Sequence, residues 1–173
     1  MEKKIEDYGI VGNLHTVALI SDGGSVDWLC LPYIDSPSVF GALLDSSKGG
    51  RFTINPVSKW DSTAAYLPQT NILVTTFRTA EGIVRLTDFM PAIETTGFGP
   101  APFTMYRLIE AVEGAAEIQV RFEPRFDYGR AETVLKYFED GISAVAGDER
   151  VFLSCSERRS EERRVGKECA TGC

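Results

Sequence analysis

The feature that most constrains this 173-residue chain is a succession of short segments rich in β-branched and aromatic residues, each bounded by Gly, Asp, Asn or Pro. Such side chains suit the pleated surface of a β-strand, and such boundaries suit turns. Ten strands are predicted in this way: 16–20, 26–31, 51–54, 72–79, 83–89, 104–112, 117–122, 133–138, 142–145 and 151–155. The sequence therefore predicts an all-β fold, an antiparallel β-sandwich with one short helix.

The links between these segments are tight and carry glycine, which adopts the positive φ that hairpin turns need. The links are 22–25, 80–82, 113–114 and 139–141. Consecutive strands should therefore pair antiparallel. The short helix is expected within 35–44, because Asp35 or Ser36 can cap its first turn and Pro37 suits the first helical position.

Two strands and two cysteines indicate which side chains are buried. Apolar residues occur on both faces of 72–79, so this strand is predicted to lie between two layers. Alternation along 26–31 places Trp28 on the face opposite Asp27, and we expect Trp28 in the core. Cys30 and Cys155 belong to apolar runs and are expected to be buried as small hydrophobic residues.

The charge and residue counts exclude several classes of partner. A formal net charge of -7 and a pI near 4.8 argue against nucleic acid, which needs a concentrated basic surface. A neutral partner such as a sugar is compatible. With one histidine, His15, and no Cys-x-x-Cys pair, neither a metal site nor a cofactor is expected. No apolar run follows the first lysines, so we expect no signal peptide and no membrane span, and a cytoplasmic protein.

The end of the chain differs in composition from the rest. Residues 157–168 hold 5 basic and 4 acidic side chains and almost nothing to bury. We expect 157–173 to be a charged tail outside the fold. Its sequence resembles translated vector or adapter sequence, so we expect it to be a sequence artefact. Residues 1–156 are then one incomplete β-sandwich domain.

Six sequence blocks spread over the predicted domain carry a family resemblance. In chain order they read IEDYGIVGN at 5–13, TVALI at 16–20, GSVDWLCLP at 24–32, DSPSVF at 35–40, LTDFMP at 86–91 and RFDYGR at 125–130. Together they resemble the trehalase-like amino-terminal domain of prokaryotic family 15 glycoside hydrolases, the glucoamylase, trehalase and glucodextranase-like enzymes. One departure is Tyr33-Ile34, where many relatives carry Arg-Phe.

The resemblance implies an antiparallel β-sandwich followed by an (α/α)₆ barrel that hydrolyses α-glucosidic bonds with inversion. In such enzymes one glutamic acid protonates the leaving oxygen and a second glutamate activates water. Both glutamates belong to the barrel, and nothing in residues 1–156 matches their motif. We therefore expect no catalytic residue here, a fragment that is inactive alone, and an α-glucoside that binds through the missing barrel.

Three aspartates are candidate site residues. Asp22, Asp27 and Asp35 could serve as an acid/base pair on a sugar. However, Asp22 opens a turn and Asp35 suits a helix cap, so only Asp27 lacks a local role. A structural or interdomain hydrogen bond is expected of Asp27.

Aromatic and charged loop residues are the other candidates. Tyr33 follows Pro32 and suits exposed contact, while Tyr66 and Trp60 are weaker candidates for stacking on a sugar. Charges around Tyr128-Gly129 could bind a ligand or domain partner, or brace a loop by salt bridges. The residues predicted for substrate or interdomain contact are Asp27, Tyr33, Asp35, Arg125, Asp127 and Arg130. Alternative hypotheses are an independent carbohydrate-binding module and a structural or association domain.

Overall fold

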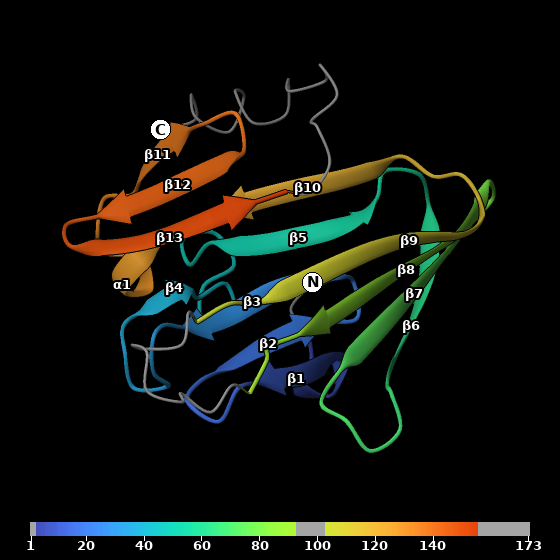
Figure 1. Ribbon diagram of the computed structural model, residues 1–173, viewed down its shortest axis with the longest axis horizontal. Coiled ribbons are helices and arrows are strands. Elements are labelled where there is room, and N and C mark those ends of the chain that lie inside the picture. Colours follow the sequence, from blue (N-terminus) through green and yellow to red (C-terminus); the bar gives the residue numbers. More distant parts are fainter. Residues whose placement is uncertain (1–2, 93–102, 156–173) are drawn as a thin grey trace. The chain divides into compact units, whose positions relative to one another are not determined.

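The computed structural model describes residues 3–92 and 103–155 of a chain that divides into two compact units, 1–130 and 131–173 (Figure 1). The predicted charged tail, 157–173, lies outside the described residues. No helix in the described part of the chain is long and apolar enough to cross a membrane.

Two antiparallel sheets form the first unit. The first sheet has the order β1-β2-β3-β5-β10, and β4 pairs with β3 at its side. Its strands are β1 (Tyr8–Gly12), β2 (Val17–Ser21), β3 (Ser25–Cys30), β4 (Ser38–Phe40), β5 (Arg51–Pro56) and β10 (Ile118–Glu123). The second sheet, β6-β7-β8-β9, consists of β6 (Trp60–Tyr66), β7 (Leu73–Thr79), β8 (Gly82–Phe89) and β9 (Tyr106–Gly114). A short 3-10 helix, η1 (Ile5–Asp7), precedes β1, and a helical turn, α1 (Phe126–Gly129), follows β10.

The second unit is a three-stranded antiparallel sheet in chain order. It consists of β11 (Val134–Tyr137), β12 (Gly141–Ala146) and β13 (Glu149–Ser154). The predicted turn at 139–141 joins β11 to β12, where the Phe138 amide donates to the Gly141 carbonyl at 2.9 Å. All ten strands predicted from the sequence are present in the two units, with small shifts at their ends. The all-β, antiparallel fold with one short α-helix is therefore confirmed.

The core of the first unit lies between its two sheets, which approach closely at Gly24. A Cβ atom at Gly24 would lie 3.0 Å from Phe77 Cζ and 3.2 Å from Leu86 Cδ2, and both of these side chains are fully buried. The φ of Gly24 is 71°, a conformation that other residues rarely adopt. The predicted glycine turn at 22–25 therefore serves both the backbone and the packing of the sheets.

The helix predicted within 35–44 is wrong. Ser38–Phe40 forms β4 instead, where Phe40 pairs with Leu29 and Ser38 with Cys30. The Val39 carbonyl accepts a hydrogen bond from the Arg125 amide at 2.9 Å. Because β4 satisfies its backbone through two distant segments and buries Val39 and Phe40, sheet pairing overrides the local capping signal.

The expectation that consecutive strands pair fails at the link 113–114. β9 ends the second sheet, where Gly114 pairs with Gly82, whereas β10 joins the first sheet, where Phe122 pairs with Phe52. The glycine link therefore carries the chain from one sheet to the other (Figure 1).

Two burial predictions also need correction. Between β2 and β3, Leu19 pairs with Trp28 but the next residue, Ile20, pairs with Val26. Asp27 is therefore the extra residue of a β-bulge. A bulge breaks the alternation, so Asp27 is buried and Trp28 only partly buried. Along β7, one face is buried and the other is partly exposed, so in the described residues the strand is covered from one side only.

The cysteine predictions had mixed outcomes. Cys30 is 1% exposed, as expected, and burial raises the pKa of its thiol. Cys155 is exposed, because it lies just beyond the end of β13 rather than within a buried strand.

Candidate functional site

The loop between β1 and β2 presents a leucine to solvent in a strained conformation. Leu14 has a φ of 72° and is 94% exposed. The Asn13 side-chain oxygen holds this turn by accepting hydrogen bonds from the amides of His15 at 3.1 Å and Thr16 at 3.0 Å. A left-handed backbone conformation is unfavourable for leucine, and exposure of its side chain to water is unfavourable as well. The turn nevertheless holds Leu14 in this position.

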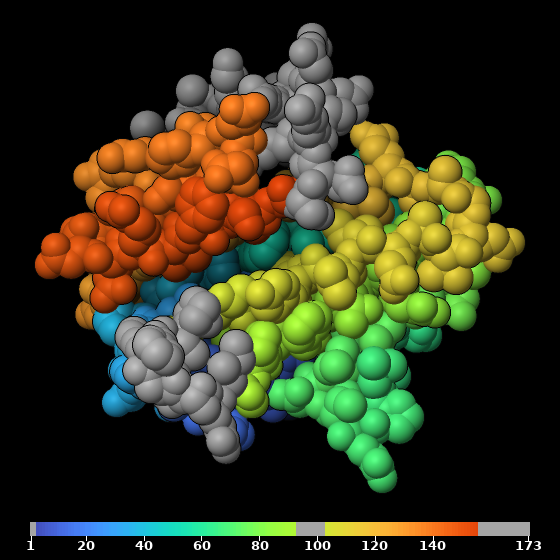
Figure 2. Space-filling view, viewed as in Figure 1, coloured from blue at the N-terminus to red at the C-terminus, as the bar shows by residue number. Residues whose placement is uncertain are grey.

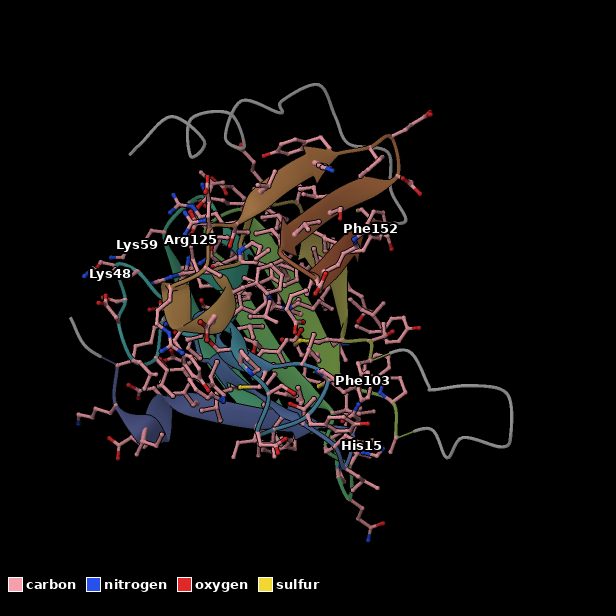
Figure 3. All side chains as sticks on the ribbon, turned by 90° about the vertical axis from the view of Figure 1, so that its left-hand side faces the viewer. His15, Lys48, Lys59, Phe103, Arg125 and Phe152 are labelled. Carbon is pink, nitrogen blue, oxygen red and sulfur yellow. The ribbon has the colours of Figure 1, made fainter. Side chains whose placement is uncertain are left out.

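An aromatic cluster adjoins Leu14. The rings of His15, Tyr33 and Phe103 touch edge to face, with centroids 5.6 to 5.9 Å apart. Figure 3 shows His15 beside Phe103. The Ile34 amide donates to the His15 carbonyl at 3.0 Å, which ties the loop after β3 to the loop after β1. We call these five residues, Leu14, His15, Tyr33, Ile34 and Phe103, the end surface.

The end surface has the character of a contact region. Tyr33 is 50% exposed and Ile34 and Leu14 are also exposed, so in the part of the chain that the structure describes the end surface carries three exposed, large apolar side chains. Soluble domains rarely leave such groups in contact with water unless another molecule covers them. Sequence reasoning considered His15 only as a metal ligand and missed Leu14, Ile34 and Phe103; the Asn13 turn signal could have located the loop.

Asp27 lies in a buried polar network, not in an open cleft. Its carboxylate accepts hydrogen bonds from the Ser25 hydroxyl, from the Tyr8 hydroxyl at 2.9 Å and from Lys3 Nζ at 3.1 Å. Asp27 is 3% exposed. These hydrogen bonds occupy both carboxylate oxygens of Asp27 within the fold.

The predicted charged loop folds around α1. Asp127 and Tyr128 both have positive φ, and Arg130 forms an ion pair with Asp127 at 2.7 Å and lies over the Tyr128 ring. The Tyr128 amide donates to Ser38 Oγ at 3.0 Å, and its ring lies 6.1 Å from that of Trp28. The ion pair joins Asp127 to Arg130 across this turn.

The remaining candidates lie on either side of β4. Asp35 is exposed in the loop before β4. Arg125 is exposed, bonds through its backbone to Val39, and donates from its guanidinium to the Pro124 carbonyl at 3.3 Å. The structure thus places Tyr33 in the end surface and Asp27 in a buried network. In the described residues, no three His, Cys, Asp or Glu side chains gather in a way that could hold a metal ion.

The sequence blocks that build these loops identify the family. The chain belongs to the trehalase-like, N-terminal domain family, whose model matches residues 1–159. The resemblance found from the sequence is therefore confirmed.

Curated relatives of the chain are trehalases. The trehalase of Thermoplasma volcanium is 35% identical over 158 residues, which cover 87% of this chain and 24% of that enzyme. The trehalase of Mycobacterium tuberculosis is 36% identical over 147 residues, 77% of this chain and 22% of the enzyme. Trehalase 1 of Sulfolobus acidocaldarius is 35% identical over 147 residues, 84% of this chain and 24% of the enzyme.

These relatives are much longer than the chain, which spans about a quarter of the length of the trehalases that it matches. No solved structure matches the chain significantly.

Proposed function

We propose that this chain is the non-catalytic amino-terminal domain of an inverting hydrolase of α-glucosidic bonds, of trehalase or glucoamylase type. In this proposal the domain docks on the catalytic (α/α)₆ barrel through the end surface and shapes its entrance. Membership of the trehalase-like family supports the enzyme class. The relatives are about four times as long as the matched segment, which supports a further, larger domain on which this one docks.

The observation that carries the docking proposal is Leu14. A leucine in left-handed backbone costs about 1–2 kcal/mol. Burial of its side chain against a partner stabilises the complex by about 1.5–3 kcal/mol. A residue that is 94% exposed at a φ of 72° is therefore explained by a partner that covers it.

The domain contributes no acid/base pair in this proposal. Asp27 is buried and saturated with hydrogen bonds, and the family resemblance assigns both glutamates to the barrel. The purified chain is therefore expected to release no glucose from trehalose, maltose or soluble starch. Glucose release that disappears in Asp27→Asn or Asp35→Asn would overturn this assignment.

A chimera tests the docking surface. Residues 1–155 would replace the matching segment of the Thermoplasma volcanium trehalase, whose barrel is retained. We expect the domain and barrel to unfold in one calorimetric transition and the chimera to hydrolyse trehalose. Leu14→Asp should split the transition in two and lower the hydrolysis rate, while Leu44→Asp, at another exposed leucine, should change neither.

The competing outcome is association of the chain with itself. If light scattering finds the isolated chain as a dimer that Leu14→Asp dissociates, the end surface joins copies of the domain. If Leu14→Asp leaves the chimera unchanged, the end surface does not dock on the barrel.

A further inference from the structure

We propose that the outer face of the second sheet binds a neutral oligosaccharide of α-linked glucose units. The proposal deepens the proposed function, and it rests on that function for the α-glucoside, whereas the structure alone points to a neutral sugar. A groove of about 490 Å³ lies on this face, between β6 and Glu110 on β9. Its volume is within the range of small-ligand sites, about 300–1,000 Å³.

The groove crosses all four strands of the sheet. Thr63, Thr76, Arg85 and Glu110 stand opposite one another in the strand register and line the groove. They alternate along β7 and β8 with buried residues such as Thr75 and Leu86, so they lie on the face away from the core. Figure 2 shows β8 and β9 side by side on the side of the first unit that faces the viewer.

The charges in this row favour an uncharged, hydroxyl-rich ligand. Arg85 Nη1 lies 3.8 Å from Glu110 Oε2, so the two charges neutralise each other within the groove. The two side chains are 44% and 58% exposed, and exposed pairs add little stability, so their donors and acceptors remain available to sugar hydroxyls. The chain's net charge of -7 disfavours an anion.

The same row disfavours a protein partner. Protein interfaces are depleted of charged residues at their centres. Here an ion pair and two threonine hydroxyls occupy the middle of the face. A sugar, by contrast, needs both hydrogen-bonding groups and an apolar wall, and the groove supplies that wall through Val74 and Leu67.

An aromatic pair extends the outer face beyond the groove. Tyr106 and Phe89 pair across β9 and β8 and alternate with the buried residues of β8, so they lie on the same face as Arg85. Tyr106 is 46% exposed and stacks on Phe89 with a centroid distance of 5.2 Å. Aromatic surfaces of this kind suit the apolar faces of glucose rings. The Tyr66 side chain pairs with buried Leu73 and bonds the backbone of Ile10 on β1, so its ring belongs to the opposite face.

The test is an NMR titration of the isotope-labelled 173-residue chain with maltotriose and with cellotriose. Maltotriose should shift the amide signals of Thr76, Arg85 and Glu110. Arg85→Ala should weaken binding at least about tenfold, the loss that one charge-assisted hydrogen bond carries. Thr76→Trp should fill the groove and abolish binding, and tryptophan suits a strand. Arg121→Ala, an exposed arginine on β10 of the other sheet, is the matched control and should bind normally.

Other outcomes overturn the proposal. Maltotriose shifts that are absent, that map to the end surface, or that persist in both groove variants would remove the groove as a sugar site. Equal binding of cellotriose would overturn the α-glucoside assignment. The titration uses the chain without a barrel, so its failure is distinguishable from failure of the docking proposal, which the chimera measures.

Discussion

Arg107 on β9 and Asp88 on β8 form an ion pair whose side chains are only 3% and 0% exposed. Arg107 Nε lies 2.8 Å from Asp88 Oδ1, and Nη2 lies 3.2 Å from Oδ2. The same guanidinium donates to the carbonyls of Phe52 and Gly24 at 2.7 Å each. Burial raises the pKa of the Asp88 carboxyl, and Arg107 opposes that rise. The pair therefore ties the second sheet to the first.

Arg107→Met should lower the free energy of unfolding by about 3–5 kcal/mol, because it leaves a buried carboxylate without its cation. Urea denaturation followed by tryptophan fluorescence measures this loss. Adding Asp88→Leu should recover part of it, since the orphaned charge is then removed. A loss below about 1 kcal/mol for the single variant would contradict a structural role for the pair.

Thr75→Val should stabilise the chain. Thr75 lies on the buried face of β7, and its Oγ1 has no hydrogen-bond partner among the described residues. Valine keeps the shape and removes the unpaired hydroxyl, so we expect a gain of about 1 kcal/mol in the free energy of unfolding. Thr76→Val, on the exposed face of the same strand, serves as the control and should change stability little.

Tyr8 should make the fold sensitive to alkali. Burial and then the hydrogen bond to Asp27 raise the pKa of the Tyr8 phenol well above its ordinary 10.0. The folded chain therefore keeps a proton that the unfolded chain loses. This contribution to stability is complete below about pH 10 and is lost as the pH rises toward the folded pKa. Melting temperatures across roughly pH 8 to 11 should fall more steeply for the native chain than for Tyr8→Phe.

Asp45 should make the loop that contains it sensitive to acid. Hydrogen bonds from the side chain and backbone of Ser47 lower the pKa of the Asp45 carboxyl below its ordinary 3.8. These hydrogen bonds stabilise the loop fully at a pH above 3.8, the ordinary pKa of the carboxyl. The stabilisation is lost as the pH falls through the lower pKa of the folded chain. The protection of the Ser47 and Lys48 amides, the slowing of their exchange relative to that of an unstructured peptide at the same pH, should fall on acidification, and Asp45→Ala should show low protection at every pH.

Leu14→Asn separates stability from docking. Asparagine tolerates left-handed backbone better than leucine, so the variant should raise the free energy of unfolding of the chain by about 0.5–1 kcal/mol. The chimera with the barrel should nevertheless lose its single transition, because the apolar contact is gone. An equally cooperative chimera would show that Leu14 is not part of the interface.

The sequence predicted the strands whose own residues favour them, and it missed those that depend on distant partners. In β1, two glycines lower the strand propensity, but at Gly9 the missing side chain makes room for Leu73, whose Cδ2 would lie 2.6 Å from a Cβ there. β6 carries small and polar residues and is largely exposed, so it shows no clear hydrophobic pattern. Its pairing with β7 along the whole of Trp60–Tyr66 supplies what its composition does not.

The candidate site was predictable only in part. Tyr33 follows a proline after a strand, which is a local signal for a loop. Contact of Tyr33 with His15 and Phe103 depends on three loops far apart in the sequence, and no local pattern encodes that. Trp28 was misplaced because a β-bulge at Asp27 leaves no mark in a simple alternation.

The passage of the chain from β9 to β10 has a consequence for synthesis on the ribosome. The second sheet consists of strands that are neighbours in sequence, so it can pair as each strand emerges. The first sheet remains open along β5 until Ile118–Glu123 has been made, more than sixty residues after its partner strand. A nascent chain shorter than this exposes an unpaired strand edge, which is when aggregation competes most strongly with folding.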